Sequence, residues 1–216
     1  MIAPPGSPRI GILGGTFDPP HLAHLAVAEE AREALGLSRV LFVPAGQPWQ
    51  KVDRAVSPAH LRLAMVERAI AGNPSFAADG REVRRPGPSY TVETVEELAA
   101  ETGAELWFIL STEALAGLST WRDPGRILAL ARLCLVPRDG APDAAIARFV
   151  ESHPAAGGRI AVLDSARLAI SSTMVRARVR AGRSIRYLVP DAVAALIAEH
   201  ALYVADPAPA PAPADA

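Results

Sequence analysis

Short runs of apolar residues alternate with longer amphipathic stretches along most of the chain. An apolar run bounded by Gly, Pro or charged residues predicts a buried strand, whereas apolar positions at steps of three and four predict a helix. Strands are expected at residues 10–13, 40–43, 106–110, 133–136 and 159–163, with a strand pair, or a strand with a turn at Gly80, in segment 76–84. Helices are expected at residues 21–36, 58–71, 91–102, 123–131, 142–152, 171–182 and 191–200. This alternation is typical of an α/β fold, a Rossmann-like, doubly wound and mostly parallel sheet with helices on both faces.

Capping residues mark several of these helix boundaries. Ser57 is expected to cap the second helix, and either Ser171 or Ser172 to cap the helix that begins there. Gly36 and Gly103 follow the first and third helices and are suited to end them.

The two ends of the chain differ in composition from the rest. Residues 1–8 have the sequence MIAPPGSP, and residues 205–216 form an Ala/Pro repeat, so both are expected to be disordered extensions. Residues 9–204 are expected to form a single domain, because a chain of 216 residues is long enough for one substantial core.

Composition narrows the classes of protein to consider. Half of the residues are hydrophobic and the formal charge is only −1, whereas a general nucleic-acid binder is usually basic. The single cysteine, Cys134, excludes an internal disulfide and a cysteine-cluster metal site, and its apolar neighbours predict a buried strand position. We find no apolar span of membrane-helix length and no signal peptide. The chain is therefore expected to be soluble and cytoplasmic, with neither nucleic acid nor membrane as a partner.

Segment 9–25, RIGILGGTFDPPHLAHL, is the first candidate for chemistry. Gly14 and Gly15 end the first strand and allow a sharp turn close to a ligand. The helix N-terminus that follows the prolines binds anions well, because unpaired N–H groups and the helix dipole both point there. Asp18 is expected to hold this turn through its side chain rather than to bind a metal.

His21 and His24 are three residues apart at the start of this helix, so they project from roughly one face. The helix dipole disfavours imidazolium at this position, and a bound polyphosphate would reverse that preference. A capped helix with two surface histidines is the alternative interpretation. The coincidence of a glycine pair, Asp-Pro and both histidines favours a phosphate site.

Segment 169–190, AISSTMVRARVRAGRSIRYLVP, is the second candidate. Arg176, Arg180 and Arg183 share one helix face, whereas Arg178 points elsewhere. Two hydroxyls at a helix N-terminus with an arginine one turn inside can hold a phosphate. The alternative is a solvated basic helix.

These segments resemble a known family. GGTFDPPHLAHL closely resembles the N-terminal signature of the bacterial nicotinate mononucleotide adenylyltransferases, which belong to the HxGH nucleotidyltransferase superfamily. The HxGH motif corresponds here to His21-Leu22-Ala23-His24, where the extra methyl of Ala23 keeps helix propensity but crowds a nucleotide packed on that turn. The ISSTMVR segment followed by YLVP is similar to the C-terminal ISSTxxR motif of the family. The resemblance extends over about residues 9–203.

Three intermediate segments extend the resemblance. Residues 44–51, PAGQPWQK, resemble the PxxxPPHK loop of the family, and Lys51 matches its phosphate-facing lysine. Trp49 and Gln50 replace Pro and His there, and Trp49 is either a lid aromatic or part of a small local core. Residues 88–91 match PSYT and residues 119–121 match STW, whereas Trp107 is expected in the core.

The resemblance implies a set of site residues. His24 and His21 would be catalytic, with His24 stabilising charge on the α-phosphate of ATP. The implied ATP-binding residues are Gly14, Gly15, Thr16, Phe17, His21, His24, Lys51, Ser111, Glu113, Ser171, Ser172 and Arg176. The implied mononucleotide-binding residues are Thr16, Lys51, Tyr90, Thr91 and Trp121. Thr91 would hold the pyridine carboxylate and cap the next helix, and Trp121 would stack on the nicotinate ring.

One segment departs from the family pattern. After the fourth strand the family usually has Gly-x-Asp against the ATP ribose, and this chain has Ser111-Thr112-Glu113. Glu113 keeps a carboxylate that is one methylene longer, and Ser111 lacks the backbone freedom of glycine. Altered ATP binding is the expected consequence.

By this resemblance the protein transfers the adenylyl group of ATP to nicotinate mononucleotide, giving deamido-NAD and pyrophosphate. Mg²⁺ would bind mainly through ATP phosphates, without dedicated protein ligands. The oligomeric state stays open, with a homo-oligomer as one possibility.

Three alternatives remain at this point. A nicotinamide mononucleotide or phosphopantetheine adenylyltransferase fits the motifs at the two ends, but the PSYT and STW segments argue against both. A non-catalytic nucleotide-binding protein is suggested by the changes at Ala23, Gln50, Ser111 and Glu113. A dinucleotide-binding oxidoreductase is suggested only by the α/β alternation, and the first turn lacks GxGxxG.

Overall fold

The computed structural model describes residues 6–48, 56–137, 142–165 and 168–204. The strands are β1 (Arg9–Gly15), β2 (Arg39–Pro44), β3 (Phe76–Ala78), β4 (Glu105–Ser111), β5 (Ala131–Val136) and β6 (Ile160–Val162). They form one sheet in the order β3-β2-β1-β4-β5-β6, and every neighbouring pair is parallel. The predicted Rossmann-like α/β fold is therefore confirmed.

Helices connect successive strands and cover both faces of the sheet. They are α1 (Leu22–Leu35), α2 (Ala59–Ile70), α3 (Arg81–Arg84), α4 (Thr91–Thr102), α5 (Thr112–Gly117), α6 (Pro124–Leu130), α7 (Pro142–Ser152), α8 (Ser172–Arg180) and α9 (Asp191–Glu199), with short 3-10 turns η2 (Leu118–Thr120) and η3 (Pro154–Ala156). In the part of the chain that the structure describes, no helix is both long and apolar enough to cross a membrane.

Alternating residues of the central strands fill two cores. Leu106, Phe108 and Leu110 of β4 face the core that α4, α5, α6 and α7 complete. Trp107 and Ile109 face the opposite core, beneath α1 and α2, where Cys134 of β5 is fully buried. The expected positions of Trp107 and Cys134 in the core are confirmed.

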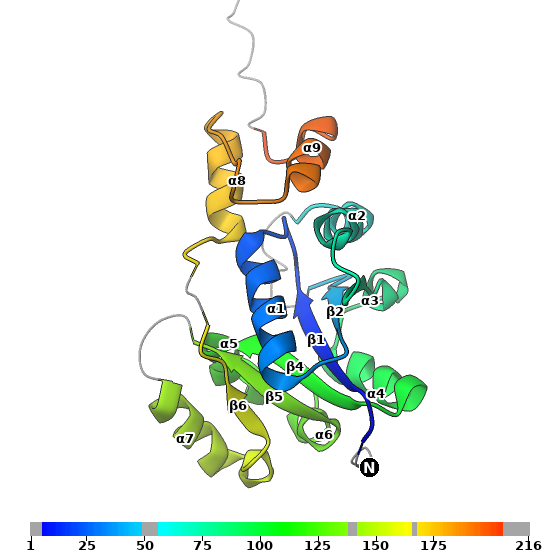
Figure 1. Cartoon of the computed structure of the whole chain (residues 1–216), viewed down its shortest axis with the longest axis vertical. Coiled ribbons are helices and arrows are strands. Elements are labelled where there is room, and N and C mark those ends of the chain that lie inside the picture. Colours follow the sequence, from blue (N-terminus) through cyan, green and yellow to red (C-terminus); the bar gives the residue numbers. More distant parts are fainter. Residues whose placement is uncertain (1–5, 49–55, 138–141, 166–167, 205–216) are drawn as a thin grey trace, which may run out of the picture.

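A third apolar cluster joins α2, α8 and α9. Met65 of α2 packs with Val175 of α8 and with Val193 and Leu196 of α9. Figure 1 shows α8 and α9 together beyond the carboxyl end of the sheet, above α1. This cluster places the N-terminus of α8 beside the turn that follows β1.

The predicted C-caps Gly36 and Gly103 are confirmed, whereas one N-cap and some short elements differ from the predictions. Segment 76–84 is not a strand pair; it holds the strand β3 and then, from Gly80, the one-turn helix α3, which is closer to the alternative of a strand with a turn at Gly80. Helices α5 and η2 were not predicted, because helices of six and three residues are too short to give a clear period. Ser57 does not cap α2: Pro58 occupies that position, and the backbone of Ser57 bonds to Asp18 and Arg62 instead.

The predicted domain limits stay predictions. The expected extension at 205–216 and most of that at 1–8 lie outside the described residues.

Candidate active site

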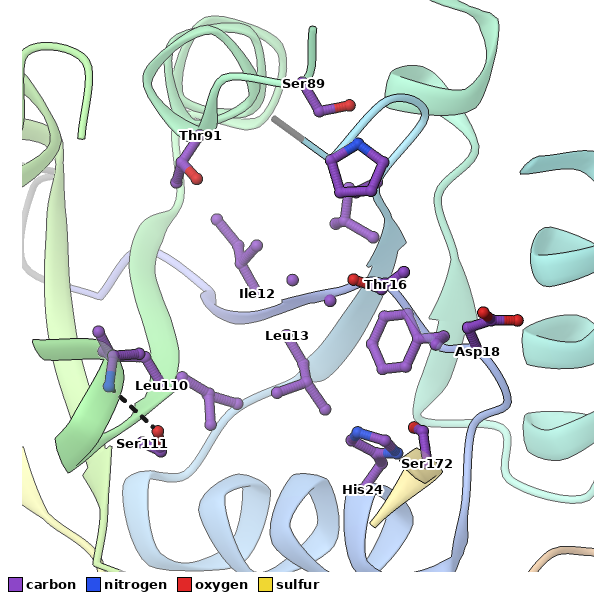
Figure 2. Close-up of a pocket in the computed structure, with 18 of the residues that line it drawn as sticks. Ile12, Leu13, Thr16, Asp18, His24, Ser89, Thr91, Leu110, Ser111 and Ser172 are labelled. Carbon is purple, nitrogen blue, oxygen red and sulfur yellow. Dashed lines mark hydrogen bonds between the residues drawn. The ribbon is translucent and has the colours of Figure 1, made fainter. Parts of the chain in front are cut away.

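The site lies where the strand order reverses. From β1 the chain crosses to β2 on one side, while β4 and then β5 lie on the other, so a crevice opens at the carboxyl ends of β1 and β4. A cavity of about 460 Å³ occupies this position. Figure 2 shows Thr16, His24 and Ser172 on one side of it and Thr91 on the other.

Most of the predicted site residues meet in this cavity. Its walls include Gly14, Gly15, Thr16, Phe17, His21, His24, Thr91, Ser111, Trp121, Ser171, Ser172 and Arg176. Tyr90 and Glu113 line neither this cavity nor its neighbour. Lys51, Trp49 and Gln50 lie outside the described residues.

A second cavity of about 370 Å³ lies on the other side of the two histidines. His21, His24, Ser111 and Ser171 line both cavities. The second cavity has apolar walls that include Ala23 and Pro137, together with Val27, Leu168 and Ile170, which the sequence did not single out. The methyl of Ala23, in the glycine position of the motif, is thus part of this wall.

His21 and His24 are held in fixed orientations at the start of α1. Their rings stack with centroids 3.7 Å apart, which confirms that the side chains share one face. The backbone N–H of His21 donates to Nδ1 of His24 at 3.1 Å. Because a backbone N–H can only donate, Nδ1 carries a lone pair, and a neutral His24 carries its proton on Nε2. The ring of Phe17 meets His24 edge to face at 5.1 Å and supports this orientation.

The N-terminus of α1 offers fewer free N–H groups than the sequence suggested. The N–H of His21 is used by His24, and the N–H of Leu22 donates to the carbonyl of Leu188 at 3.0 Å. An anion bound at this turn would therefore depend on side chains and on the N-terminus of α8.

Helix α8 brings its first residues to the same turn. Ser171 caps the helix by accepting from the N–H of Met174, so the prediction that one of the two serines caps is confirmed for Ser171. The hydroxyl of Ser172 donates to the carbonyl of Pro19 at 2.8 Å. Arg176 donates to the carbonyl of Asp18 at 2.7 Å. The contacts hold two hydroxyls and a guanidinium beside the histidines.

Asp18 has a different role from the one predicted. Its side chain accepts from the hydroxyl of Tyr203 at 2.6 Å and from the N–H of Ser57 at 3.4 Å, rather than from its own turn. Burial, and then Asp18, raise the pKa of Tyr203 far above its usual value. Asp18 thus ties the turn after β1 to the C-terminal segment.

Arg62 is a structural residue that the sequence did not single out. It is 1% exposed and donates to three backbone carbonyls, those of Thr16, Gly46 and Ser57, at 2.8–2.9 Å. Burial lowers its pKa, and Asp18 opposes this effect. Arg62 lies on the apolar face of α2, one turn before Met65. An arginine among apolar helix positions is unusual, and this was the feature of the sequence that could have indicated a buried structural role.

The opposite wall of the cavity comes from α4 and from the segment after η2. Thr91 is the first residue of α4, and Tyr90 holds the cap position without a side-chain bond, so Thr91 does not cap this helix. The ring of Trp121 meets Phe108 edge to face at 5.9 Å. Arg122 lies 4.7 Å from the centre of the Tyr90 ring.

A buried polar cluster behind this wall was also missed. Glu82 is 8% exposed and accepts from the hydroxyl of Thr94 at 2.6 Å. Burial raises the pKa of the Glu82 carboxyl, and hydrogen bonds from Thr94 and Ser89 oppose it. Ser89 in turn accepts from the N–H of Gly46 at 2.8 Å. Helix α3 is too short to show a helical period, so no sequence pattern places Glu82 at the cavity.

Ser111 fits its position without strain. Its φ of −75° is ordinary for any residue, and its hydroxyl caps α5 by accepting from the N–H of Ala114 at 3.2 Å. The backbone freedom of glycine is therefore not needed here. Glu113 is exposed in the first turn of α5.

The described residues contain no group of three side chains able to hold a metal ion. Both oxygens of Asp18, a carboxylate that lines the cavity, are engaged by Tyr203 and Ser57. The donor set therefore fits a cation carried by phosphate oxygens rather than one bound in a cage of carboxylates.

The strand order and the paired histidines beside a Ser-Arg helix N-terminus define a nucleotidyltransferase of the cytidylyltransferase-like class, and residues 12–178 match the family model of that description. A relative from Roseiflexus sp. (strain RS-1), named "probable nicotinate-nucleotide adenylyltransferase", is 48% identical over 91% of this chain and 98% of its own length. A relative of the same name from Corynebacterium kroppenstedtii is 44% identical over 91% of this chain and 92% of its own. The chain belongs to the nicotinate-nucleotide adenylyltransferase family.

A solved structure agrees with the fold. Plasmodium falciparum nicotinic acid mononucleotide adenylyltransferase complexed with NaAD superposes with a TM-score of 0.72 at 17% identity, covering 91% of this chain and 97% of that one. The same strand arrangement is thus shared by a distant enzyme.

Proposed function

We propose that this protein transfers the adenylyl group of ATP to nicotinate mononucleotide, releasing pyrophosphate and forming deamido-NAD for NAD biosynthesis. One observation carries the proposal: His24, the N-terminus of α8 and the Thr91–Trp121 wall line a single cavity. Curated relatives at 40–48% identity bear the corresponding name. The dependence on ATP also favours the cytoplasmic location predicted from the sequence.

The two cavities suggest how the substrates divide the site. The apolar second cavity suits the adenosine of ATP, and its triphosphate then passes the histidines toward Ser172 and Arg176. The mononucleotide ring would occupy the first cavity beside Trp121. Lys51 is predicted to face the phosphates. Glu113 lines neither cavity, so its predicted contact with the ATP ribose would require the side chain to reach in from the exposed first turn of α5.

Chemistry would occur at the histidines. An oxygen of the mononucleotide phosphate attacks the α-phosphorus of ATP, and the bond to the bridging oxygen breaks as pyrophosphate leaves. The attacking phosphate is already anionic, so no general base is required, and catalysis rests on position and charge. A neutral His24 would donate from Nε2 to an α-phosphate oxygen, while Arg176 and the α8 N-terminus neutralise the leaving pyrophosphate.

Mg²⁺ would enter with ATP and neutralise phosphate charge, held by phosphate oxygens and water. Discrimination between acid and amide would come from α4. Its N-terminus reaches the cavity at Thr91, and the positive end of the helix dipole favours a carboxylate over a neutral carboxamide. The oligomeric state stays open.

A product assay tests this function. Purified protein is mixed with ATP, Mg²⁺ and either nicotinate or nicotinamide mononucleotide, and pyrophosphate and dinucleotide are followed together. Turnover with the acid in preference to the amide is expected. Preference for the amide, or ATP binding by calorimetry without turnover of either substrate, would contradict the proposal.

A further inference from the structure

We propose that Arg122 is a positioning residue that fixes the pyridine-binding wall of the cavity by joining Trp121 to the N-terminus of α4. The inference rests on the proposed function, because it assigns Trp121 and Thr91 to the mononucleotide. Arg122 itself does not line either cavity.

The two halves of this wall come from separate parts of the chain. Thr91 begins α4, whereas Trp121 lies in a short connection between η2 and α6. The connection is irregular: Trp121 has extended dihedral angles and the next cap residue, Asp123, has a left-handed φ of 46°. Neither Thr91 nor Trp121 belongs to a strand, so the hydrogen bonds of the sheet do not set the distance between these two residues.

Arg122 spans this gap with one side chain. Its guanidinium carbon lies 4.7 Å from the centre of the Tyr90 ring, next to Thr91 in sequence. Its Nη1 atom donates to Oε1 of Glu93 at 3.0 Å, in the first turn of α4. A planar cation stacked on an aromatic ring and hydrogen-bonded to a carboxylate has a defined orientation. The residue that follows Trp121 is thereby held against both Tyr90 and Glu93.

The chain offers a matched control in Arg126. This arginine, on α6, donates to Glu96 of the same helix α4 at 2.7 Å, and its side chain is 48% exposed against 59% for Arg122. Both pairs tie the Trp121–α6 region to α4. Only Arg122 also stacks on Tyr90. Comparing alanine variants of Arg122 and Arg126 therefore distinguishes the effect of losing the Tyr90 contact from the effect of losing a surface ion pair.

The experiment measures steady-state kinetics of the full-length protein, the Arg122→Ala variant and the Arg126→Ala variant, with both substrates varied. Arg122→Ala should raise the KM for nicotinate mononucleotide about two- to fivefold, as expected for loss of an exposed cation–π contact. The KM for ATP, kcat and the urea midpoint should match those of Arg126→Ala. An unchanged mononucleotide KM, or an equal rise in both variants, would overturn the inference.

A double-mutant cycle tests the contact itself. If Arg122 acts through the ring of Tyr90, the effects of Arg122→Ala and Tyr90→Leu on the mononucleotide KM should be less than additive. Additive effects would show that the stack does not carry the positioning.

A measurement that does not use activity keeps this inference separate from the proposed function. In a chain with Trp49 and Trp107 replaced by Phe, the fluorescence of Trp121 is quenched with acrylamide. Arg122→Ala should increase the quenching constant and Arg126→Ala should not. Equal quenching constants for Arg122→Ala and Arg126→Ala would overturn the inference. If the quenching constants differ as expected but the wild-type protein has no adenylyltransferase activity, only the proposed function is overturned.

Discussion

The two ring nitrogens of His24 have separate tasks. Nδ1 accepts the N–H of His21 and so serves the helix N-terminus, while His24 also lines the cavity, where Nε2 is the proposed donor. On the proposed mechanism, stability and chemistry depend on different atoms of one side chain, and substitutions can separate them.

His24→Asn and His24→Ala should differ in stability but not in activity. Asn places Oδ1 near the position of Nδ1 and can still accept the N–H of His21, whereas Ala cannot. Both variants should lose about 100- to 1,000-fold in kcat, the usual effect of removing a donor to transition-state charge. Only Ala should also lose about 1 kcal/mol of unfolding free energy in urea titrations. A His24→Asn variant with near wild-type kcat would remove Nε2 from the mechanism.

Glu82 gives a pH-dependent prediction. Burial raises its folded-state pKa above the ordinary value near 4.5. The folded protein then holds the proton more tightly than the unfolded chain, so the stability that the neutral carboxyl contributes is present at low pH. It is lost as the pH rises through the folded-state pKa.

Glu82→Gln should therefore show a flatter decline of unfolding free energy above about pH 4.5 than wild type. Urea titrations at several pH values measure this dependence, and Glu113→Gln, which removes an exposed carboxylate, is the matched control. Parallel curves for wild type and Glu82→Gln would contradict the prediction.

The sequence identified the residues that line the cavity better than those that support them. His24, Thr91, Trp121 and Ser172 lie in short motifs, and the structure places them all at one cavity. Arg62 belongs to no motif, because it bonds to backbone carbonyls that any residue would supply.

At the scale of elements, long strands and helices were predictable because their apolar period is clear. Helix α3 has four residues and helix α5 has six, so neither reaches two full turns. A helix of this length contains too few residues to show a hydrophobic period, so only a capping residue could have indicated where it begins. Ser111 is such a cap, although it stands where the family usually has a glycine.

Ser111 supplies a prediction about α5. Replacing a capping serine by Ala costs about 0.5–2 kcal/mol, whereas Gly costs only a few tenths. Ser111→Ala should therefore lower the urea midpoint clearly, and Ser111→Gly, the residue more usual in the family, should leave it almost unchanged. Equal midpoints for the two variants would show that the cap does not stabilise α5.

At the scale of the whole molecule, the C-terminal segment completes the turn that follows the first strand. Helices α8 and α9 pack on α2, and Tyr203 reaches Asp18 across 185 residues of sequence. This arrangement could not be predicted from the sequence. The spacing of hydrophobic residues indicates where helices and strands lie, but not which distant side chains contact one another.

Tyr203→Phe should destabilise the protein by about 1.5–3 kcal/mol, because it leaves a buried carboxylate oxygen of Asp18 without this donor. Urea denaturation measures the loss. Tyr187→Phe is the control, since that ring is 78% exposed and its hydroxyl should contribute little. Equal stability of the two variants would contradict a structural role for the Tyr203–Asp18 bond.

The bond between Tyr203 and Asp18 also has a consequence for synthesis of the protein. After a ribosome has added Asp18, it must add another 185 residues before Tyr203 is present. At about 5–20 residues per second this takes roughly ten to forty seconds. Throughout that interval the nascent chain carries its histidines without the partner of Asp18, so nucleotide turnover should begin only after Tyr203 has been added.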